Sequence, residues 1–234
     1  MEAIEQARLV PRSLRLSLPI RLEPAGSRVQ ILNGTLGFPT MKDARQHIRK
    51  QVRDRRNQLD FHTQQVAATQ LVEQCLRLET FQSSQNIALY LSTDGELNTA
   101  PLIDALWQKN KSIYIPVLHP FSPGHLLFLH YQKSSKMVKN KYGIAEPKLD
   151  QRHIIPAHQL DLICTPLVAF DDQCQRLGMG GGYYDRTLAP WFKTGVGAKP
   201  IGLAHDCQQI DQIPTAAWDI PLPMIVTPSK VWQR

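Results

Sequence analysis

The sequence has no apolar run long enough to cross a membrane and few cysteines. A transmembrane helix needs about 20 predominantly apolar residues, whereas the longest apolar run, 160–170, is interrupted by Asp161, Thr165 and Pro166. The chain has 4 cysteines, none in a Cys-x-x-Cys pair: Cys75, Cys164, Cys174 and Cys207. This pattern predicts a reduced, cytoplasmic protein with no membrane association, no disulfide framework and no zinc site.

Acidic residues are in the minority. There are 27 Lys and Arg against 20 Asp and Glu, which gives a net charge of +7 and an isoelectric point near 9.3. Such a balance favours anionic partners, among them nucleotides, polyglutamylated cofactors and nucleic acid, but does not choose between them. A length of 234 residues with 42% hydrophobic residues suits one large α/β domain with a sizeable core.

The first 40 residues lack hydrophobic periodicity, and they also lack the apolar core and small-residue cleavage site of a signal peptide. Four prolines and five arginines are scattered through them. We therefore expect residues 1–40 to be a poorly ordered extension and residues 41–234 to form a single domain. Met41 is a candidate for the biological start of the chain.

Apolar residues at helical spacing predict a first helix over 41–59 and a second over 63–78. In the first helix we expect the stem of Arg55 to share an apolar face with aliphatic residues. A neighbouring face is basic and carries Arg45, Arg49, Arg53 and Arg56. A basic helix face alone is usually only solvated.

Strands and helices then alternate, which predicts a three-layer α/β fold with a largely parallel central sheet flanked by helices. The expected strands are 86–91, 112–118, 126–131, 160–170, 200–204 and 224–227, with helices ending near 109 and spanning about 183–191. Ligands of such sheets bind at the carboxyl ends of the strands. The polar loops 92–96 and 171–182 are therefore the predicted ligand site.

The second of these loops carries the most informative motif, RLGMGGGYYDR, residues 176–186. Its glycines allow close backbone approach, and a turn from strand to helix directs N–H groups at one point, which suits phosphate. No Gly-Lys-Ser/Thr follows, so it is not a Walker A loop, and Tyr183 replaces the third glycine of a dinucleotide fingerprint. A tight structural turn would explain the glycines, but not the cation, aromatics and carboxylate that flank them.

Four separated segments resemble the 5-formyltetrahydrofolate cyclo-ligase family, also called methenyltetrahydrofolate synthetases. They are LSTDGELNT at 91–99, YGIAEP at 142–147, LVAFDDQCQRLGMGGGYYDRTL at 167–188 and AAWDIPLPMIVTPSKVW at 216–232. They occur in the expected order, and the resemblance covers residue 41 to the end. It implies an ATP-dependent ligase of one-carbon folate metabolism.

The resemblance implies that 5-formyltetrahydrofolate is cyclised to 5,10-methenyltetrahydrofolate, with release of ADP and phosphate, through a phosphorylated formyl group. An N-formyl oxygen leaves poorly, whereas a phosphorylated oxygen leaves well. The implied work of the protein is to align the γ-phosphoryl group with that oxygen and to neutralise charge. The implied partners are two small molecules, ATP and the folate, with Mg²⁺ as cofactor. We expect a monomer that binds neither nucleic acid nor membranes.

The resemblance also implies residue roles. Arg176 and Tyr184 would be catalytic, Asp185 and Asp219 would bind the metal, and Leu91 and Glu96 would bind the folate. A carboxylate suits the pterin because it accepts two hydrogen bonds at once. The implied ATP-binding residues are Arg45, Arg49, Arg176, Gly178, Met179, Gly180, Gly181, Gly182, Tyr183 and Tyr184. Arg45 stands where the family usually has lysine. Simpler roles are a helix-dipole carboxylate for Asp185 and a turn residue for Asp219.

Two other classes of function remain open at this stage. Related α/β sheets host sugar-phosphate isomerases and coenzyme A transferases, because a fold does not decide a function. Such enzymes do not require MgATP. The basic helix and high isoelectric point would also suit a nucleic-acid binder, although no nucleic-acid module is recognisable.

Overall fold

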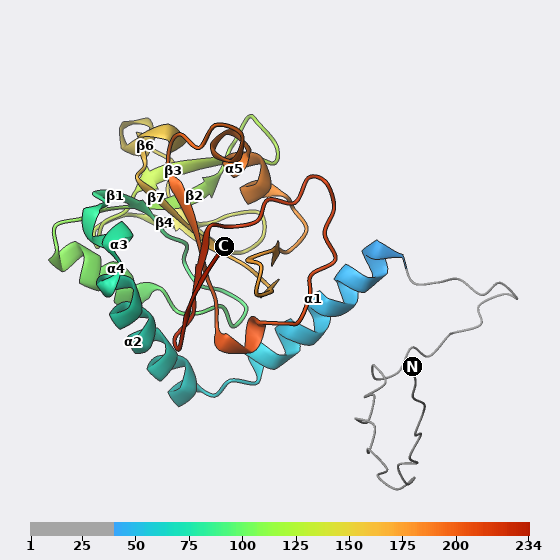
Figure 1. Ribbon diagram of the computed structural model, residues 1–234. Coiled ribbons are helices and arrows are strands. Elements are labelled where there is room, and N and C mark those ends of the chain that lie inside the picture. Colours follow the sequence, from blue (N-terminus) through green and yellow to red (C-terminus); the bar gives the residue numbers. More distant parts are fainter. Residues whose placement is uncertain (1–39) are drawn as a thin grey trace, which may run out of the picture. The chain divides into compact units, whose positions relative to one another are not determined.

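The computed structural model describes residues 40–234, and Figure 1 shows their arrangement. The expected extension lies almost wholly outside the described residues, so its order remains a prediction. The first described helix begins at Met41 and is capped by Thr40, whose side chain accepts a hydrogen bond from the Asp43 backbone. No helix of the described part is long and apolar enough to span a membrane.

An eight-stranded sheet forms the centre, in the order β12-β11-β10-β7-β1-β2-β3-β6. The five strands from β11 to β2 are parallel, and β12, β3 and β6 add antiparallel edges. The strands are β1 (Asn86–Ala88), β2 (Ser112–Leu118), β3 (Leu126–His130), β6 (Ile154–Ile155), β7 (Leu162–Pro166), β10 (Lys199–Leu203), β11 (Met224–Val226) and β12 (Val231–Gln233). The predicted largely parallel sheet is confirmed.

Helices cover both faces of this sheet, as the alternating pattern predicted (Figure 1). Leu71 of α2 and Leu106 of α4 pack with Ile87 in one buried cluster, whereas Leu188 of α5 packs with Ile163 in another. The helices are α1 (Met41–Asn57), α2 (Phe61–Arg77), α3 (Glu79–Ser83), α4 (Ala100–Gln108) and α5 (Tyr183–Thr194), with short 3₁₀ turns η1 (Gln151–His153), η2 (Ala157–Gln159) and η3 (Asp206–Gln208). The three-layer α/β expectation is therefore confirmed.

The long strand expected over 160–170 is wrong, because the chain leaves the main sheet after β7. Beyond Pro166 the carbonyl oxygens of Leu167 and Val168 accept hydrogen bonds from Gln208 Nε2 at 2.6 and 3.0 Å. The chain then forms β8 (Ala169–Phe170), which pairs with β9 (Arg176–Leu177) in a two-stranded sheet. A second such sheet joins β4 (Met137–Lys139) to β5 (Ala145–Pro147). The hydrophobic pattern of residues 160–170 could not predict this break, because β7 and β8 are both buried and therefore both apolar.

The buried arginine of α1 is Arg56, not Arg55. Arg56 is 0% exposed, whereas Arg55 is exposed. A buried guanidinium needs partners, and Arg56 finds them in Asp94 and in the carbonyl oxygen of Leu167. These partners belong to the loops that follow β1 and β7, so α1 bridges the carboxyl ends of both strands.

Candidate active site

The glycine-rich loop, Gly178–Gly182, leaves β9 and leads directly into α5. Gly180 and Gly182 have φ of 97° and 66°, a region that residues with a Cβ rarely adopt. Gly182 is the N-cap residue of α5 and offers no side chain to the helix N–H groups. The free N–H groups of the first helical turn therefore lie beside the loop, where they suit an anion.

Arg176 lies just before this loop and is 6% exposed. Its Nη2 atom donates to the Asp185 carboxylate, on the first turn of α5. Its Nε–H has no hydrogen-bond partner among the described residues. Burial lowers the pKa of Arg176, and the Asp185 carboxylate opposes that effect. A buried cation with a free donor is costly unless a ligand completes its partners.

Arg45 and Asp219 form the second ion pair of the site, with 2.6 Å between Nη2 and Oδ1. Their side chains are only 13% and 11% exposed, although the residues lie 174 positions apart. The Nε–H of Arg45 also lacks a partner within the described chain. Arg49, one turn along α1, donates from Nε to the Gly178 carbonyl oxygen at 2.8 Å. Helix α1 therefore contacts both the glycine loop and the Asp219 turn.

The site has two carboxylates: Asp219 accepts from Arg45 through Oδ1 and from the Ala216 N–H through Oδ2, and Asp185 pairs with Arg176. The charges of Asp185 and Asp219 both raise the pKa of that guanidinium. Residues 40–234 contain no group of three or more metal-binding side chains. An Mg²⁺ ion carried by phosphate oxygens needs only one or two protein carboxylates, because water and phosphates complete its octahedron. The donor set thus fits a nucleotide-bound Mg²⁺ ion rather than a metal held by the protein alone.

Glu96 lies in the loop that follows β1. This loop contacts the C-terminal end of α1 through Asp94 and Arg56, whereas the glycine loop contacts Arg49. The Glu96 Oε2 atom accepts a hydrogen bond from the Thr93 backbone N–H at 3.0 Å, and no described residue donates to Oε1. Burial raises the pKa of Glu96, partly offset by that backbone N–H and by the charge of Arg56. Leu91 starts the same loop and packs against the main core cluster. Its proposed folate contact remains a prediction.

The two tyrosines after the glycine loop have different surroundings. Tyr184 packs against the core, and burial raises its pKa, with the Glu96 charge raising it further and Arg176 lowering it. Its hydroxyl therefore stays protonated. The Tyr183 hydroxyl instead hydrogen-bonds to the Tyr142 hydroxyl, at 3.0 Å. Met179 is 56% exposed on the loop.

Several residues of this region were missed by sequence reasoning. Asp94 accepts hydrogen bonds from α1, Arg186 donates from Nη2 to the Gly181 carbonyl oxygen at 2.5 Å, and Tyr142 reaches Tyr183. His205 follows β10, is 2% exposed and has a pKa lowered to about 4, mainly by burial. Asp94, Tyr142 and Arg186 lie within segments that carry the family resemblance, and Asp-Gly marks a tight turn, but no local pattern indicates which residues they contact.

Comparisons with known proteins agree with the sequence resemblance. The 5-formyltetrahydrofolate cyclo-ligase family matches residues 41–228. The chain is 50% identical over 184 residues to the 5-formyltetrahydrofolate cyclo-ligase of Escherichia coli K12, covering 78% of this chain and 99% of that protein. It is 47% identical over 178 residues to the enzyme of that name from Haemophilus influenzae, covering 76% and 94%.

Solved structures support the same fold. The 5,10-methenyltetrahydrofolate synthetase of Aquifex aeolicus matches with a TM-score of 0.69 and 28% identity, covering 81% of this chain and 92% of that one. The Mycoplasma pneumoniae enzyme of that name matches with a TM-score of 0.61 at 22% identity and supports the fold alone.

Proposed function

The chain belongs to the 5-formyltetrahydrofolate cyclo-ligase family, and we propose that it uses ATP to cyclise 5-formyltetrahydrofolate to 5,10-methenyltetrahydrofolate. The observation that carries the ATP requirement is a pair of buried Nε–H groups, on Arg45 and Arg176, that have no partner within residues 40–234. Each arginine is paired with a carboxylate, and together they lie around a glycine loop and a helix N-terminus. A polyphosphate carrying a divalent cation complements this arrangement.

The residues around the glycine loop, here called the nucleotide side, include more positively than negatively charged side chains. Three guanidinium groups, Arg45, Arg49 and Arg176, face two carboxylates, Asp185 and Asp219. In our proposal the guanidinium groups and the glycine-loop amides bind the phosphates, and the two carboxylates hold the Mg²⁺ ion that the nucleotide brings. That ion, when bound, offsets phosphate charge. Tyr183 lies beside the loop on the exposed side, where its ring can cover the nucleotide.

The folate side supplies hydrogen-bond acceptors and an apolar wall. The Oε1 atom of Glu96, to which no described residue donates, suits the donors of the pterin ring, and Leu91 packs beside its loop. We place Tyr184 between the two substrates, because it follows the glycine loop in the first turn of α5 and packs against the core. We assign the protonated Tyr184 hydroxyl and the Arg176 cation to the oxygen that accepts the phosphoryl group.

The chemistry proceeds in two steps. The formyl oxygen attacks the γ-phosphorus, the bond to the β–γ bridging oxygen breaks, and ADP leaves with that electron pair. The resulting iminium phosphate is electrophilic at the formyl carbon. N10 attacks this carbon, the carbon–oxygen bond breaks, phosphate leaves with the former formyl oxygen, and N10 loses its proton to solvent. Positioning and charge neutralisation are the contributions of the protein.

The direct test is to mix the protein with MgATP and folinic acid and to follow the near-ultraviolet absorbance of methenyltetrahydrofolate. We expect absorbance only when both substrates are present. An ATP-independent reaction on a sugar phosphate or a coenzyme A ester, without folinate-dependent ATP hydrolysis, would replace this proposal with the isomerase or transferase alternative.

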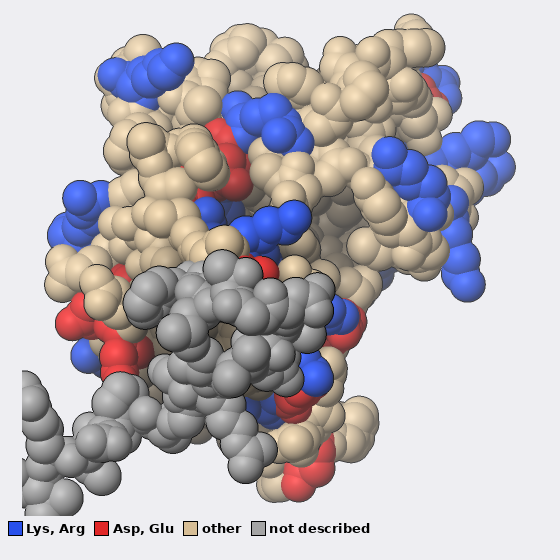
Figure 2. Space-filling view, turned by 90° about the vertical axis from the view of Figure 1, so that its right-hand side faces the viewer, with Lys and Arg blue, Asp and Glu red and all other residues tan. Residues whose placement is uncertain are grey.

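We also propose a cytoplasmic monomer that does not bind nucleic acid. Figure 2 shows separate groups of Lys and Arg side chains, several beside Asp or Glu, rather than one continuous basic stripe on the part of this face formed by described residues. The basic face of α1 is occupied by partners within the chain, including Asp219 and Asp94. Retention of a labelled duplex or RNA at physiological salt would contradict this view, and sedimentation would test the monomer.

A further inference from the structure

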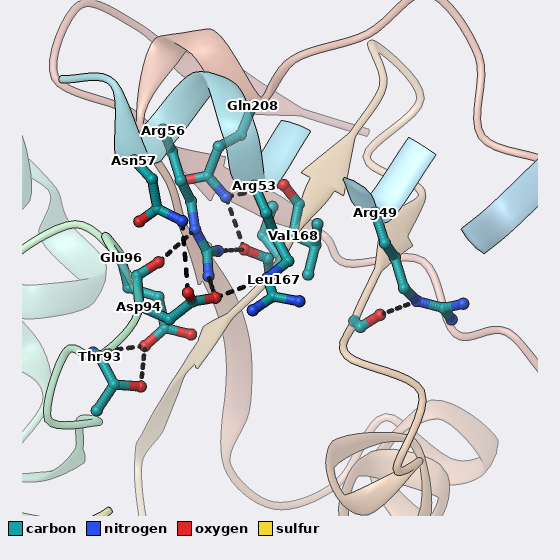
Figure 3. A network of polar contacts seen from close by, with 11 residues as sticks. Arg49, Arg53, Arg56, Asn57, Thr93, Asp94, Glu96, Leu167, Val168 and Gln208 are labelled. Carbon is teal, nitrogen blue, oxygen red and sulfur yellow. Dashed lines mark hydrogen bonds and ion pairs between the residues drawn. The ribbon is translucent and has the colours of Figure 1, made fainter. Parts of the chain in front are cut away.

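A network of side chains joins α1 to the loop that carries Glu96 (Figure 3). We propose that Asp94 is a positioning residue: its contacts with Arg53, Arg56 and Asn57, here called the clasp, hold Glu96 in place and couple the folate loop to the nucleotide loop through α1. The inference rests on the proposed function and adds to it a route by which one substrate affects the binding of the other.

The turn that presents Glu96 has an unusual backbone. Asp94 and Gly95 have φ of 51° and 70°, and the Glu96 N–H donates to the Thr93 carbonyl oxygen at 2.9 Å. Positive φ at both central residues is the pattern of a type I′ turn. A Cβ on Gly95 would lie 2.3 Å from Asn57 Oδ1, so the turn fits closely against the end of α1. Asp and Gly tolerate positive φ, so the sequence favours this turn locally, but its position against α1 has to be held by contacts with the helix.

The clasp supplies that hold. Arg56 donates from Nε to the Asp94 carbonyl oxygen at 2.8 Å and from Nη2 to Asp94 Oδ2 at 2.7 Å. Arg53 Nε donates to the same Oδ2 at 2.7 Å, and Asn57 Nδ2 lies 3.4 Å from Oδ1. The Arg53 side chain is 42% exposed and that of Arg56 is 0% exposed. The clasp is thus anchored on a buried cation, with Asp94 as its counter-charge.

The same helix holds the nucleotide loop at its other end. Arg49 donates to Gly178, and Figure 3 shows this contact on α1 apart from the clasp. Arg45 pairs with Asp219 one turn earlier. At 1.5 Å per residue, the span from Arg45 to Arg56 is about 16 Å of one rigid element. In our proposal phosphate binding shifts α1, and the rigid helix carries that shift to Asp94; such coupling acts equally in both directions.

The decisive variant is Asp94→Asn, because asparagine keeps the shape and tolerates positive φ while it removes the charge. We expect the KM for 5-formyltetrahydrofolate to rise roughly 10-fold or more, as loss of a charged hydrogen bond implies. At folate concentrations well below its KM, the KM for ATP should change less than about 3-fold, whereas at saturating folate it should rise by the factor that the coupling loses, because coupling is reciprocal. The control is Asp104→Asn, which removes a surface carboxylate 3.6 Å from Lys133, with side chains 53% and 80% exposed. The control should match the wild type.

Coupling is measured by titrating 5-formyltetrahydrofolate into the protein with and without a non-hydrolysable ATP analogue. We expect the analogue to tighten folate binding in the wild type and in Asp104→Asn, but much less in Asp94→Asn. An unchanged folate KM and unchanged tightening would overturn the inference, as would equal rises in both KM values with a lowered melting temperature, which indicate a purely structural role.

Arg53→Gln removes one clasp donor from a half-exposed position and repeats the test if Asp94→Asn does not fold. It should show a smaller change in the same two measurements, and no change would again refute the clasp. A wild type without folinate- and ATP-dependent turnover refutes the proposed function, whereas an active wild type with unaltered variants refutes only the coupling.

Discussion

Replacing Arg176 with methionine would remove the most deeply buried cation of the nucleotide side while nearly conserving volume. The guanidinium is 6% exposed, pairs with Asp185 and keeps its Nε–H unpaired among the described residues. In the proposed complex it donates charged hydrogen bonds to phosphate. Such bonds are worth about 1.5–3 kcal/mol each. We therefore expect the KM for ATP to rise roughly 10- to 150-fold.

Stability should change far less than ATP binding. Loss of the cation leaves Asp185 without its partner, but that side chain is 37% exposed and can be hydrated. Removal of a buried charge also ends the desolvation cost that lowers the pKa of Arg176. We expect a change of about 1 kcal/mol, or roughly 2–4 °C in melting temperature for a domain of this size. Large destabilisation would mean that the ion pair has a structural role instead.

The assay is the initial rate of methenyltetrahydrofolate absorbance across a range of ATP concentrations at saturating folate. The matched control is Arg77→Met, which alters an arginine that is 75% exposed and 3.8 Å from Glu73. The control should retain the wild-type KM. If Arg176→Met also shows a KM for ATP within about 2-fold of wild type, the assignment of Arg176 to the phosphates is refuted.

Two further predictions concern Asp185 and His205. Asp185→Asn should lower kcat roughly 100-fold or more, as for other transition-state charge contacts, with little change in the folate KM; full activity at saturating Mg²⁺ would contradict its metal role. His205 has a pKa of about 4 in the fold against about 6.5 when unfolded. Because its folded pKa is depressed, it contributes stability above pH 6.5 that is lost as the pH falls towards 4. Between pH 7 and 5 this loss is about 2 kcal/mol. His205→Gln should remove that part of the pH dependence in urea unfolding, and an identical pH slope would refute the burial argument.

The local pattern of the sequence predicted most of the architecture. Alternating apolar runs located β2 (Ser112–Leu118) at its observed bounds, and α1 and α5 begin at the residues that were expected. The break within 160–170 escaped prediction because both β7 and β8 are buried, and hydrophobicity does not reveal which sheet a strand joins. The break shows only in long-range contacts: Gln208 bonds to the carbonyl oxygens of Leu167 and Val168, and β8 pairs with β9 instead of the main sheet.

The site was harder to derive from the chain itself. Resemblance named Arg45 and Asp219, but no local spacing brings together residues 174 positions apart. The helical spacing of apolar residues in α1 could not predict which arginine is buried, because Arg55 and Arg56 both lie near the apolar face. The counter-charge that decides it, Asp94, lies on another loop. Sequence patterns thus specify elements, whereas charge pairing across loops specifies the site.

The fate of the formyl oxygen tests the central claim most directly. The protein would be incubated with MgATP and 5-formyltetrahydrofolate labelled with ¹⁸O in the formyl group, and product absorbance, ADP and the mass of the released phosphate would be measured together. The account predicts methenyltetrahydrofolate and ADP in equal amounts, with one ¹⁸O atom in each phosphate. Product formed without ADP, or phosphate that carries no label, would contradict it.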